Sequence, residues 1–333
     1  MNSSITYFHR HPKAGFSINK VSQTYIREVE KQMDVKQFYV PCYRADPISL
    51  LRNLWFVFKH RNKKGVNHIT GDIHYGILAL VGCKSFLTIH DTCLLEHAKD
   101  VVKRNIFKFF WYKLPLRIVS KIVCISEKTQ TEISKIIKRK DIQVIHNAVD
   151  PQFCSAPKEF NKKKPVVLQI GTGWNKNLLN VASALFSIPC HLNIIGKISL
   201  EQQEVLKKNQ IDYSIKSDLT DEEMMAEYIN CDIVCFCSIF EGFGLPIIEA
   251  QAIGRIVITS NINPMAGVAG NGALYVNPQD ANEIKAGVLS MIQDDNLRNR
   301  IIQNGYKNVE RFNFTSIAQK YIELYQEVLN DLI

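Results

Sequence analysis

The sequence lacks a long hydrophobic run and any segment that resembles a secretory signal. Its longest apolar stretches, such as Ile233 to Cys237, fall far short of the roughly 20 residues needed to span a bilayer. Residues 1–5 show no basic region followed by an apolar one. With 46% hydrophobic and 22% charged residues, the chain is neither a disordered tail, a collagen-like fibre nor a small disulfide scaffold. Its 333 residues suggest two domains of about 150 residues each.

Cysteine occurs nine times, an odd number, and no two cysteines form a CxxC pair. We therefore interpret the chain as a cytosolic protein with reduced thiols. Cys231, Cys235 and Cys237 cluster on an apolar, strand-like run, for which buried thiols are the usual explanation and a metal site is the alternative. No other metal-ligand spacing is present, so we expect no metal and no cofactor.

The net charge of +9 is unevenly distributed along the chain. Residues 1–160 hold 26 Lys and Arg against 13 Asp and Glu, a charge of +13, whereas residues 161–333 hold 15 against 19, a charge of −4. This asymmetry indicates an anionic partner for the N-terminal half. No zinc finger, helix-turn-helix or aromatic RNA-binding signature accompanies the charge, so we do not expect nucleic acid to be that partner.

Short β-branched and aromatic runs alternate with segments of helical period through most of the chain. Most of these runs are continuously apolar, as expected of strands covered on both faces, and their alternation with helices predicts an α/β fold with parallel sheets. The expected strands are Ile5–Phe8, Gln37–Val40, Ser85–Ile89, Lys121–Ile125, Gln143–Ile145, Val166–Ile170, His191–Ile195, Asp212–Ile215, Asp232–Phe236, Ile256–Thr259 and Ala273–Val276.

Helix boundaries carry recognisable signals. Ser199 and Thr220 each begin a capping-box pattern, completed by Gln202 and Glu223 three residues later. Pro246 suits the first turn of a helix that ends near Ile253, before Gly254. Residues 315–332 predict an amphipathic helix with one apolar side, formed by Ile317, Tyr321, Leu324, Tyr325 and Val328.

The segment Ser155–Pro165 contains two prolines and three consecutive lysines, which predicts an exposed linker. We therefore divide the chain into an N-terminal domain of residues 1–155, a linker of residues 156–165 and a C-terminal domain of residues 166–314. For the terminal helix, residues 315–333, we consider a return to the N-terminal domain.

The most informative stretch is Ser238–Ala250, which places Glu241 directly after a buried strand and Glu249 within the following helix. Such a turn lies at the carboxyl end of a parallel sheet, where α/β proteins bind ligands. Gly242 and Gly244 allow the backbone to approach a ligand, and the amides at the helix start attract an anion such as phosphate. The two carboxylates can accept hydrogen bonds from the diol of a sugar or ribose. The alternative is that Glu241 is a cap and Glu249 an exposed helix residue.

This stretch resembles the E-x7-E signature of retaining glycosyltransferases of family 4, which have the GT-B fold of two Rossmann-like parallel α/β domains facing across a cleft. The resemblance covers most of the chain, because further segments occur in the order typical of the family. They are Ile122–Glu127, Ile145–Asp150 (with Ala148 replacing a glycine), Ile170–Asn177, Asn304–Gly305 and Phe312–Phe314.

The resemblance implies roles for individual residues. Glu249 would bind the nucleotide ribose, Glu241 the sugar hydroxyls, and Lys176, after Gly171, would neutralise the departing diphosphate. His90, at the end of a strand, would face the donor sugar, with a structural role as the alternative. Gly15 would lie in the glycine loop near the diphosphate, or be an ordinary turn glycine. The amides that would contact sugar and diphosphate belong to Phe243, Gly244 and Leu245, next to Gly242.

The sequence also departs from the family pattern. Thr172 and Asn175 occupy the candidate positions of an arginine that usually accompanies the lysine, so the phosphate clamp is expected to hold a single cation. The segment 266–268 stands where a glutamate is common. The family's chemistry retains anomeric configuration and needs no metal.

Basic and aromatic residues interleave over Lys99–Lys121. Such a mixture suits a membrane interface, where cations meet anionic lipid heads and amphipathic rings lie at headgroup depth. The alternative is a helix that docks on its own sheet with solvated lysines. The first interpretation predicts a peripheral protein on the inner face of the membrane.

The leading functional hypothesis is a glycosyltransferase that uses a nucleotide-sugar donor and a glycan or lipid-linked acceptor in surface polysaccharide synthesis. A sugar-nucleotide epimerase or a phosphorylase is a related alternative, although no cofactor lysine site for a phosphorylase is visible. A non-catalytic nucleotide-sugar-binding module is the alternative from another class.

Overall fold

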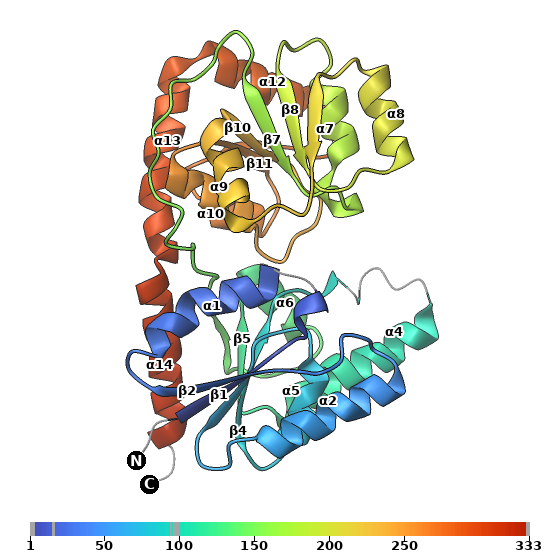
Figure 1. Ribbon diagram of the computed structural model, residues 1–333, viewed down its shortest axis with the longest axis vertical. Coiled ribbons are helices and arrows are strands. Elements are labelled where there is room, and N and C mark those ends of the chain that lie inside the picture. The colour runs from blue at the N-terminus through green and yellow to red at the C-terminus, as the bar shows by residue number, and fades with distance from the viewer. Residues whose placement is uncertain (1–3, 15–16, 94, 96–99, 331–333) are drawn as a thin grey trace. The chain divides into compact units, whose positions relative to one another are not determined.

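The computed structural model describes residues 4–14, 17–93, 95 and 100–330. The chain forms two compact units, one of Met1–Ala148 with Asn313–Ile333 and the other of Val149–Phe312 (Figure 1). Each unit contains a six-stranded sheet in which every pairing of the described strands is parallel. The predicted class of two parallel α/β domains is confirmed.

The sheet of the first unit has the strand order β2-β1-β3-β4-β5-β6. Its strands are β1 (Ser4–His9), β2 (Asp34–Tyr39), β3 (Val66–Ile69), β4 (Lys84–Ile89), β5 (Lys121–Cys124) and β6 (Ile142–Val144). Its helical segments are η1 (Pro12–Ala14), α1 (Ser17–Val29), α2 (Pro47–His60), η2 (His74–Leu80), α4 (Val101–Phe107), the π-helical η3 (Lys108–Lys113), α5 (Leu114–Ile118), α6 (Glu127–Ser134) and α14 (Phe314–Asn330).

Helices cover both faces of this sheet. Side chains of α1 and α14 pack on one face in a core that includes Ile5, Phe86 and Val123. The predicted apolar side of the terminal helix is buried there, which confirms its amphipathic pattern. On the other face α2, η2, η3, α5 and α6 pack in a second core with Phe8 and Leu87.

Strand β3 is absent from the sequence prediction, because its two central residues are polar. Both Asn67 and His68 are fully buried. The Asn67 side-chain amide accepts a hydrogen bond from the Asn62 backbone amide and donates one to the Asn62 carbonyl. The two His68 ring nitrogens lie 2.6 Å from the Tyr325 hydroxyl and 2.8 Å from the Thr88 hydroxyl. These hydrogen bonds satisfy the buried polar groups, so β3 can lie in the middle of the sheet without the continuous apolar sequence that is typical of a central strand.

The sheet of the second unit has the order β12-β11-β10-β7-β8-β9. Its strands are β7 (Val166–Ile170), β8 (His191–Ile195), β9 (Tyr213–Lys216), β10 (Ile233–Phe236), β11 (Ile256–Ser260) and β12 (Leu274–Val276). Its helical segments are η4 (Trp174–Lys176), α7 (Leu178–Ala184), α8 (Leu200–Lys208), α9 (Asp221–Asn230), α10 (Leu245–Ile253), α11 (Met265–Ala269), α12 (Ala281–Gln293), α13 (Asp295–Val309) and η5 (Glu310–Phe312). Both predicted capping boxes are present, and Gly254 ends α10 in the left-handed conformation.

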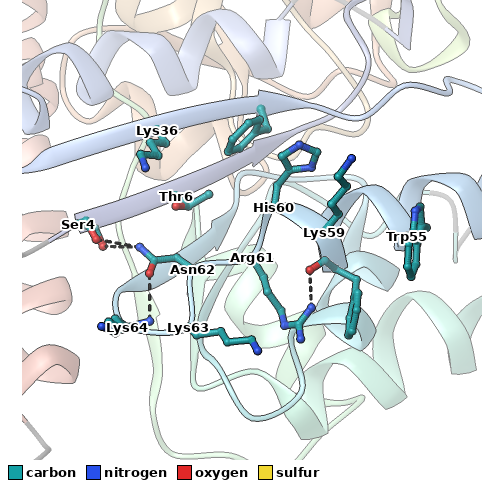
Figure 2. Close-up of a pocket in the computed structure, with 12 residues that line it drawn as sticks. Ser4, Thr6, Lys36, Trp55, Lys59, His60, Arg61, Asn62, Lys63 and Lys64 are labelled. Atoms are coloured by element: carbon teal, nitrogen blue, oxygen red, sulfur yellow. Dashed lines mark hydrogen bonds between the residues drawn. The ribbon is translucent and has the colours of Figure 1, made fainter.

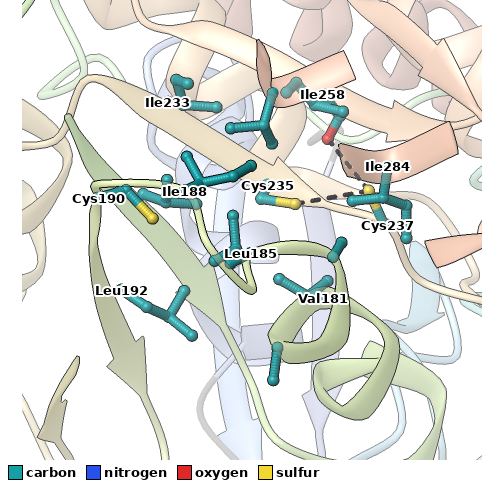
Figure 3. Close-up of a cluster of buried hydrophobic side chains, with 14 of the residues drawn as sticks. Val181, Leu185, Ile188, Cys190, Leu192, Ile233, Cys235, Cys237, Ile258 and Ile284 are labelled. Atoms are coloured by element: carbon teal, nitrogen blue, oxygen red, sulfur yellow. Dashed lines mark hydrogen bonds between the residues drawn. The ribbon is translucent and has the colours of Figure 1, made fainter. Parts of the chain in front are cut away.

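The clustered cysteines lie inside this unit. Cys235 and Cys237 pack among isoleucines and leucines of the core, with their sulfur atoms 3.6 Å apart (Figure 3). Burial raises the pKa of Cys231 to about 12, which keeps it a neutral thiol. The interpretation of the cluster as buried thiols is confirmed.

The division of the chain differs from the boundaries that the sequence suggests. The second unit begins at Val149, so the segment 155–165 lies within it, and the terminal helix α14 belongs to the first unit. The segment is mostly exposed and has no regular structure, as its prolines and lysines predict. It is nevertheless attached to the sheet, because the buried carboxylate of Asp232 accepts hydrogen bonds from the Lys158 ammonium and the amides of Asn161 and Val166.

Buried histidines predict that acid destabilises the first unit. Burial lowers the pKa of His68 to about 3, lowers the pKa values of His9 and His74 to about 4, and also lowers that of His90. As pH falls below 6.5 the unfolded chain binds protons that the folded unit excludes, so stability decreases towards pH 4. We expect His9, His68 and His74 each to cost about 2 kcal/mol between pH 7 and pH 5 in urea unfolding. The pH slope should shrink in His68→Asn and persist in the control His191→Asn, and an unchanged slope in His68→Asn would contradict the prediction.

Candidate functional site

Two neighbouring strands of the second unit run to a point where the strand order reverses. β7 pairs with β10, and the chain continues from β7 to β8 on one side and from β10 to β11 on the other. Loops after such strands leave the sheet in opposite directions and open a crevice at their carboxyl ends. The loop after β7 carries Lys176, and the loop after β10 carries Glu241. The two predicted site residues therefore belong to adjacent loops at the reversal.

Lys176 and Glu241 form an ion pair. The lysine ammonium lies 2.5 Å from Oε1 of the glutamate and 4.8 Å from the ring centre of Phe236, and both charged side chains are mostly buried. Gly171 leaves room for the lysine side chain to reach the glutamate, because a Cβ at position 171 would lie 2.9–3.2 Å from three carbons of that side chain. The φ of Gly171 is +84°, a conformation that only glycine adopts without strain.

Asparagine side chains join the two loops. The Asn175 side-chain amide donates to the Phe240 carbonyl and to Glu241, and the Asn175 backbone carbonyl accepts from the Ile239 amide. The Asn177 amide donates to the carbonyls of Cys237 and Pro278, at 2.9 and 2.6 Å. These bonds fix the position of Lys176 relative to Glu241 through the backbone as well as through the ion pair.

The glycine-rich turn after Glu241 leads directly into α10. Gly244 stands before the helix with φ +113°, so the turn depends on glycine at this position. Phe243 is buried and meets the edge of the Phe312 ring, while Leu245 begins the helix and Pro246 follows it. A Cβ at Gly244 would lie 3.6 Å from the Phe236 ring, over which the Lys176 ammonium also lies, so the amino end of α10 and its positive partial charge are close to the ion pair.

Glu249 lies one turn into α10 and accepts a hydrogen bond from the hydroxyl of Tyr228 on α9. Tyr228 is fully buried, and burial followed by the Glu249 charge raises its pKa far above the usual range. The hydroxyl therefore stays protonated and orients the carboxylate. The sequence predicts Glu249 as a site residue but gives no signal for Tyr228, which is 21 positions away.

The two residues at the candidate positions of the family's arginine form other hydrogen bonds. The Thr172 hydroxyl donates to the Lys197 carbonyl, and Asn175 is part of the loop junction. Lys176 is the one cationic side chain in the segment 171–177. Two partly exposed aromatic groups that the sequence analysis did not single out lie close by, since the rings of Trp174 and Phe240 are 6.4 Å apart.

His90 follows β4 in the first unit and is buried. Its Nε2 lies 2.8 Å from the Thr70 carbonyl, which can only accept, so Nε2 carries the proton and Nδ1 is left as an acceptor. Burial lowers the pKa of His90, so the ring is neutral at pH 7. A Cβ at Gly71 would lie 2.6 Å from this ring, which accounts for glycine there.

Arg10 is a further buried charge in the first unit that sequence analysis did not predict. It follows β1 and pairs with Asp72 after β3, and its Nε has no hydrogen-bond partner among the residues that the structure describes. The Asp72 carbonyl in turn accepts from the Trp111 indole. Arg10, Asp72 and His90 thus follow the carboxyl ends of three neighbouring strands, where the order β2-β1-β3 reverses.

Gly15 lies outside the described residues. Among the residues described, no group of three or more His, Cys, Asp or Glu is placed to hold a metal ion. The described helices include none that is long and apolar enough to cross a membrane.

Comparisons with known proteins cover most of the chain. Residues 152–308 match the family described as "Glycosyl transferases group 1", and residues 22–153 match "Glycosyltransferase Family 4". The O-antigen chain mannosyltransferase RfbU of Salmonella typhimurium is 27% identical over 70% of this chain and 67% of its own length. A Campylobacter jejuni enzyme, N,N'-diacetylbacillosaminyl-diphospho-undecaprenol alpha-1,3-N-acetylgalactosaminyltransferase, is 22% identical over 86% and 84%.

Among solved structures, sucrose-phosphate synthase from Thermosynechococcus elongatus superposes with a TM-score of 0.84. The match covers 99% of this chain and all of that one at 16% sequence identity, so it is a similarity of fold.

The contact between Gly171 and Lys176 predicts that Gly171→Ala is more destabilising than backbone strain alone. Gly82 is the matched control, since it has φ +78° but nothing within 4 Å of the position that a Cβ would take. We expect Gly82→Ala to cost about 1 kcal/mol and Gly171→Ala about 2–3 kcal/mol in urea unfolding. The excess should disappear when Lys176→Ala is added, and equal costs in both backgrounds would show that the contact has no effect.

Proposed function

The chain belongs to the glycosyltransferase family 4-like proteins of the GT-B fold, and on that premise we propose that it is a retaining enzyme with a nucleotide-diphosphate sugar as donor. Its acceptor is a glycan or a lipid-linked glycan. The observation that carries the proposal is the Lys176–Glu241 ion pair beside the amino end of α10.

The arrangement suits a reaction whose leaving group gains negative charge. An ammonium has three donors, so Lys176 can keep one bond to Glu241 and offer others to phosphate oxygens. The amides of Phe243, Gly244 and Leu245 and the helix dipole add positive potential at the same place. Both are fixed before the reaction, which is the condition for effective electrostatic stabilisation.

In the proposed step the bond between the sugar C1 and the diphosphate oxygen breaks, and its electron pair stays with the diphosphate. The acceptor hydroxyl oxygen bonds to C1 on the same face, and its proton passes to the diphosphate. Glu241 holds the sugar hydroxyls beside the turn at Gly242, and Gly171 gives room to the Lys176 side chain that meets the diphosphate. Glu249, oriented by Tyr228, holds the ribose. His90 is assigned to the donor sugar from the resemblance. No metal or other cofactor is part of the proposal.

The biological setting is proposed from the relatives. One is named for the O-antigen chain and another for an acceptor carried on diphospho-undecaprenol. We therefore place this chain in surface polysaccharide synthesis, at the inner face of the membrane where a lipid-linked acceptor would be reached.

A non-catalytic nucleotide-sugar-binding module is the second candidate. The observation in its favour is that Thr172 and Asn175 replace the usual second cation and are committed to other bonds. Donor binding without turnover would distinguish such a module from an enzyme.

We expect a UDP-, GDP- or ADP-sugar to raise the melting temperature of the protein in a thermal-shift screen, which would identify the base. Glu249→Ala should remove this shift. With the donor and an acceptor extract, Lys176→Met should reduce release of the nucleoside diphosphate by about 100-fold or more, because a fixed donor to the leaving group is lost. The exposed Lys163→Met is the control. Wild-type turnover in Lys176→Met would contradict the assigned role, and donor binding with no turnover in the wild type would favour the binding module.

We also propose that the segment Lys99–Lys121 contacts an anionic membrane. Lys99 and the Lys103 side chain lie outside the described part, and Tyr112 and Leu116 pack into the core as the alternative interpretation requires. The outer side of the same segment nevertheless exposes four large apolar side chains: Val102, Ile106, Phe109 and Phe110.

Phe109→Ser with Phe110→Ser should weaken sedimentation of the protein with vesicles that contain phosphatidylglycerol, because two interfacial rings are lost. Phe186→Ser, which removes an exposed ring from the second unit, is the control. Unchanged sedimentation of the double variant would exclude this segment as a membrane contact.

A further inference from the structure

Helix α2 has apolar side chains both on the side that packs in the core and on its exposed side. Its inner side packs into the core of the first unit through Leu50, Leu54 and Val57. Its outer side presents Ile48, Leu51, Trp55 and Phe58, which are 65%, 66%, 66% and 44% exposed. The spacing of three, four and three residues places these side chains on one stripe of the helix. A contiguous exposed apolar stripe of this kind marks a contact surface.

The stripe continues into a basic groove. A cavity of about 960 Å³ is lined by Trp55 and Phe58 from α2, by Ser4 and Thr6 of β1, and by residues of the loop after α2 (Figure 2). Its lining contains no Asp or Glu and holds five cations, namely Lys36, Lys59, Arg61, Lys63 and Lys64. Among the described residues, none of these five forms an ion pair with a carboxylate.

The loop that carries three of the cations is fixed by hydrogen bonds. The Asn62 side chain donates to the Ser4 hydroxyl at 2.8 Å and accepts from the amides of Lys64 and Gly65. The Arg61 guanidinium lies 3.5 Å from the centre of the Phe58 ring. The groove therefore exists before any ligand binds, and its charges adjoin the apolar stripe.

We propose that α2 docks on an anionic phospholipid surface, with the stripe among the lipid chains and a headgroup phosphate in the groove. The occupant must offer apolar and anionic chemistry side by side, as such a surface does. A symmetric contact with a second copy would bring the five cations against the same five. This proposal rests on the membrane partner proposed above and assigns a second contact site to it, formed by α2 and the groove.

The position of α2 suits a shared membrane-facing layer. Both α2 and the segment η3–α5 pack on η2 and join the same core on one face of the sheet. Tyr75 of η2 meets the Trp111 ring at 4.9 Å, which links this layer directly to the aromatic segment. The two exposed apolar surfaces thus belong to one layer of the first unit.

Vesicle flotation of the full chain tests the site with three variants. Leu51→Gln with Trp55→Gln removes half of the stripe, and Arg61→Gln with Lys63→Gln and Lys64→Gln removes three groove charges. Lys162→Gln with Lys163→Gln and Lys164→Gln removes the same charge from an exposed segment of the second unit and is the control. Vesicles consist of phosphatidylcholine alone or mixed with phosphatidylglycerol.

We expect wild type and control to float with the mixed vesicles and not with phosphatidylcholine. The groove variant should partition about 100-fold less, because each cation near an anionic leaflet contributes a factor of about five. The stripe variant should also lose binding. Brominated lipid should quench the fluorescence of wild type more than that of Trp55→Phe, which places Trp55 at the chains.

Equal flotation of all variants would overturn the site while leaving a membrane contact elsewhere. A dimer that dissociates in the stripe variant, without flotation of the wild type, would show that a second copy covers α2. Binding of inorganic phosphate in the groove without flotation would replace the lipid headgroup with a free anion. Nucleotide-sugar thermal shifts, measured in parallel on each variant, should be unchanged, so failure here is distinguishable from failure of the proposed enzyme.

Discussion

The passage of the Lys176 side chain over the Cα of Gly171 determines the geometry of the candidate site. Three carbons of the lysine occupy the space that any other residue at position 171 would fill with its Cβ. The ammonium consequently reaches Glu241 on the neighbouring loop, and Asn175 and Asn177 hold the two loops at that separation. Because the loop has a single cation, its electrostatic effect depends on placing that cation beside the amino end of α10. A small backbone requirement at one glycine thus controls where the charge lies.

Most of the fold follows from local patterns in the sequence. Apolar runs predict eleven of the twelve strands formed by the described residues to within a few positions, because strands covered on both faces need apolar side chains throughout. β3 is the exception. His68 is satisfied by Tyr325, 257 residues away, and such a partner leaves no trace in a local pattern. The division of the units is hidden for a similar reason, since the exposed segment 155–165 is tied to the sheet through the distant Asp232.

The sequence identifies most residues of the candidate site but not the contacts between them. Glu241, Glu249 and the glycines are recognisable because their spacing is local, and Lys176 follows a strand that the sequence marks clearly. The Lys176–Glu241 pair joins residues 65 positions apart, and the Tyr228 hydroxyl reaches Glu249 from a separate helix. Arg10 carried no signal at all, since an arginine after a strand is ordinarily solvated and its burial depends on Asp72. Catalytic roles for these residues remain predictions.

The structure also shows where part of the excess positive charge of the N-terminal half lies. Five cations of the N-terminal half surround the groove at the amino ends of β1 and β3, whereas His90 and Arg10 follow the carboxyl ends of strands in the same sheet. A six-residue strand extends about 20 Å, so the two groups lie at opposite ends of the sheet. A surface bound at the groove would therefore leave the carboxyl ends of the strands uncovered. Exposure of the apolar stripe of α2 to water costs free energy unless a partner covers it. The basic groove beside the stripe favours an anionic partner. The sequence analysis related the excess charge to residues 99–121 and made no prediction for the groove, because the groove forms only where the loop after α2 meets β1 in the fold.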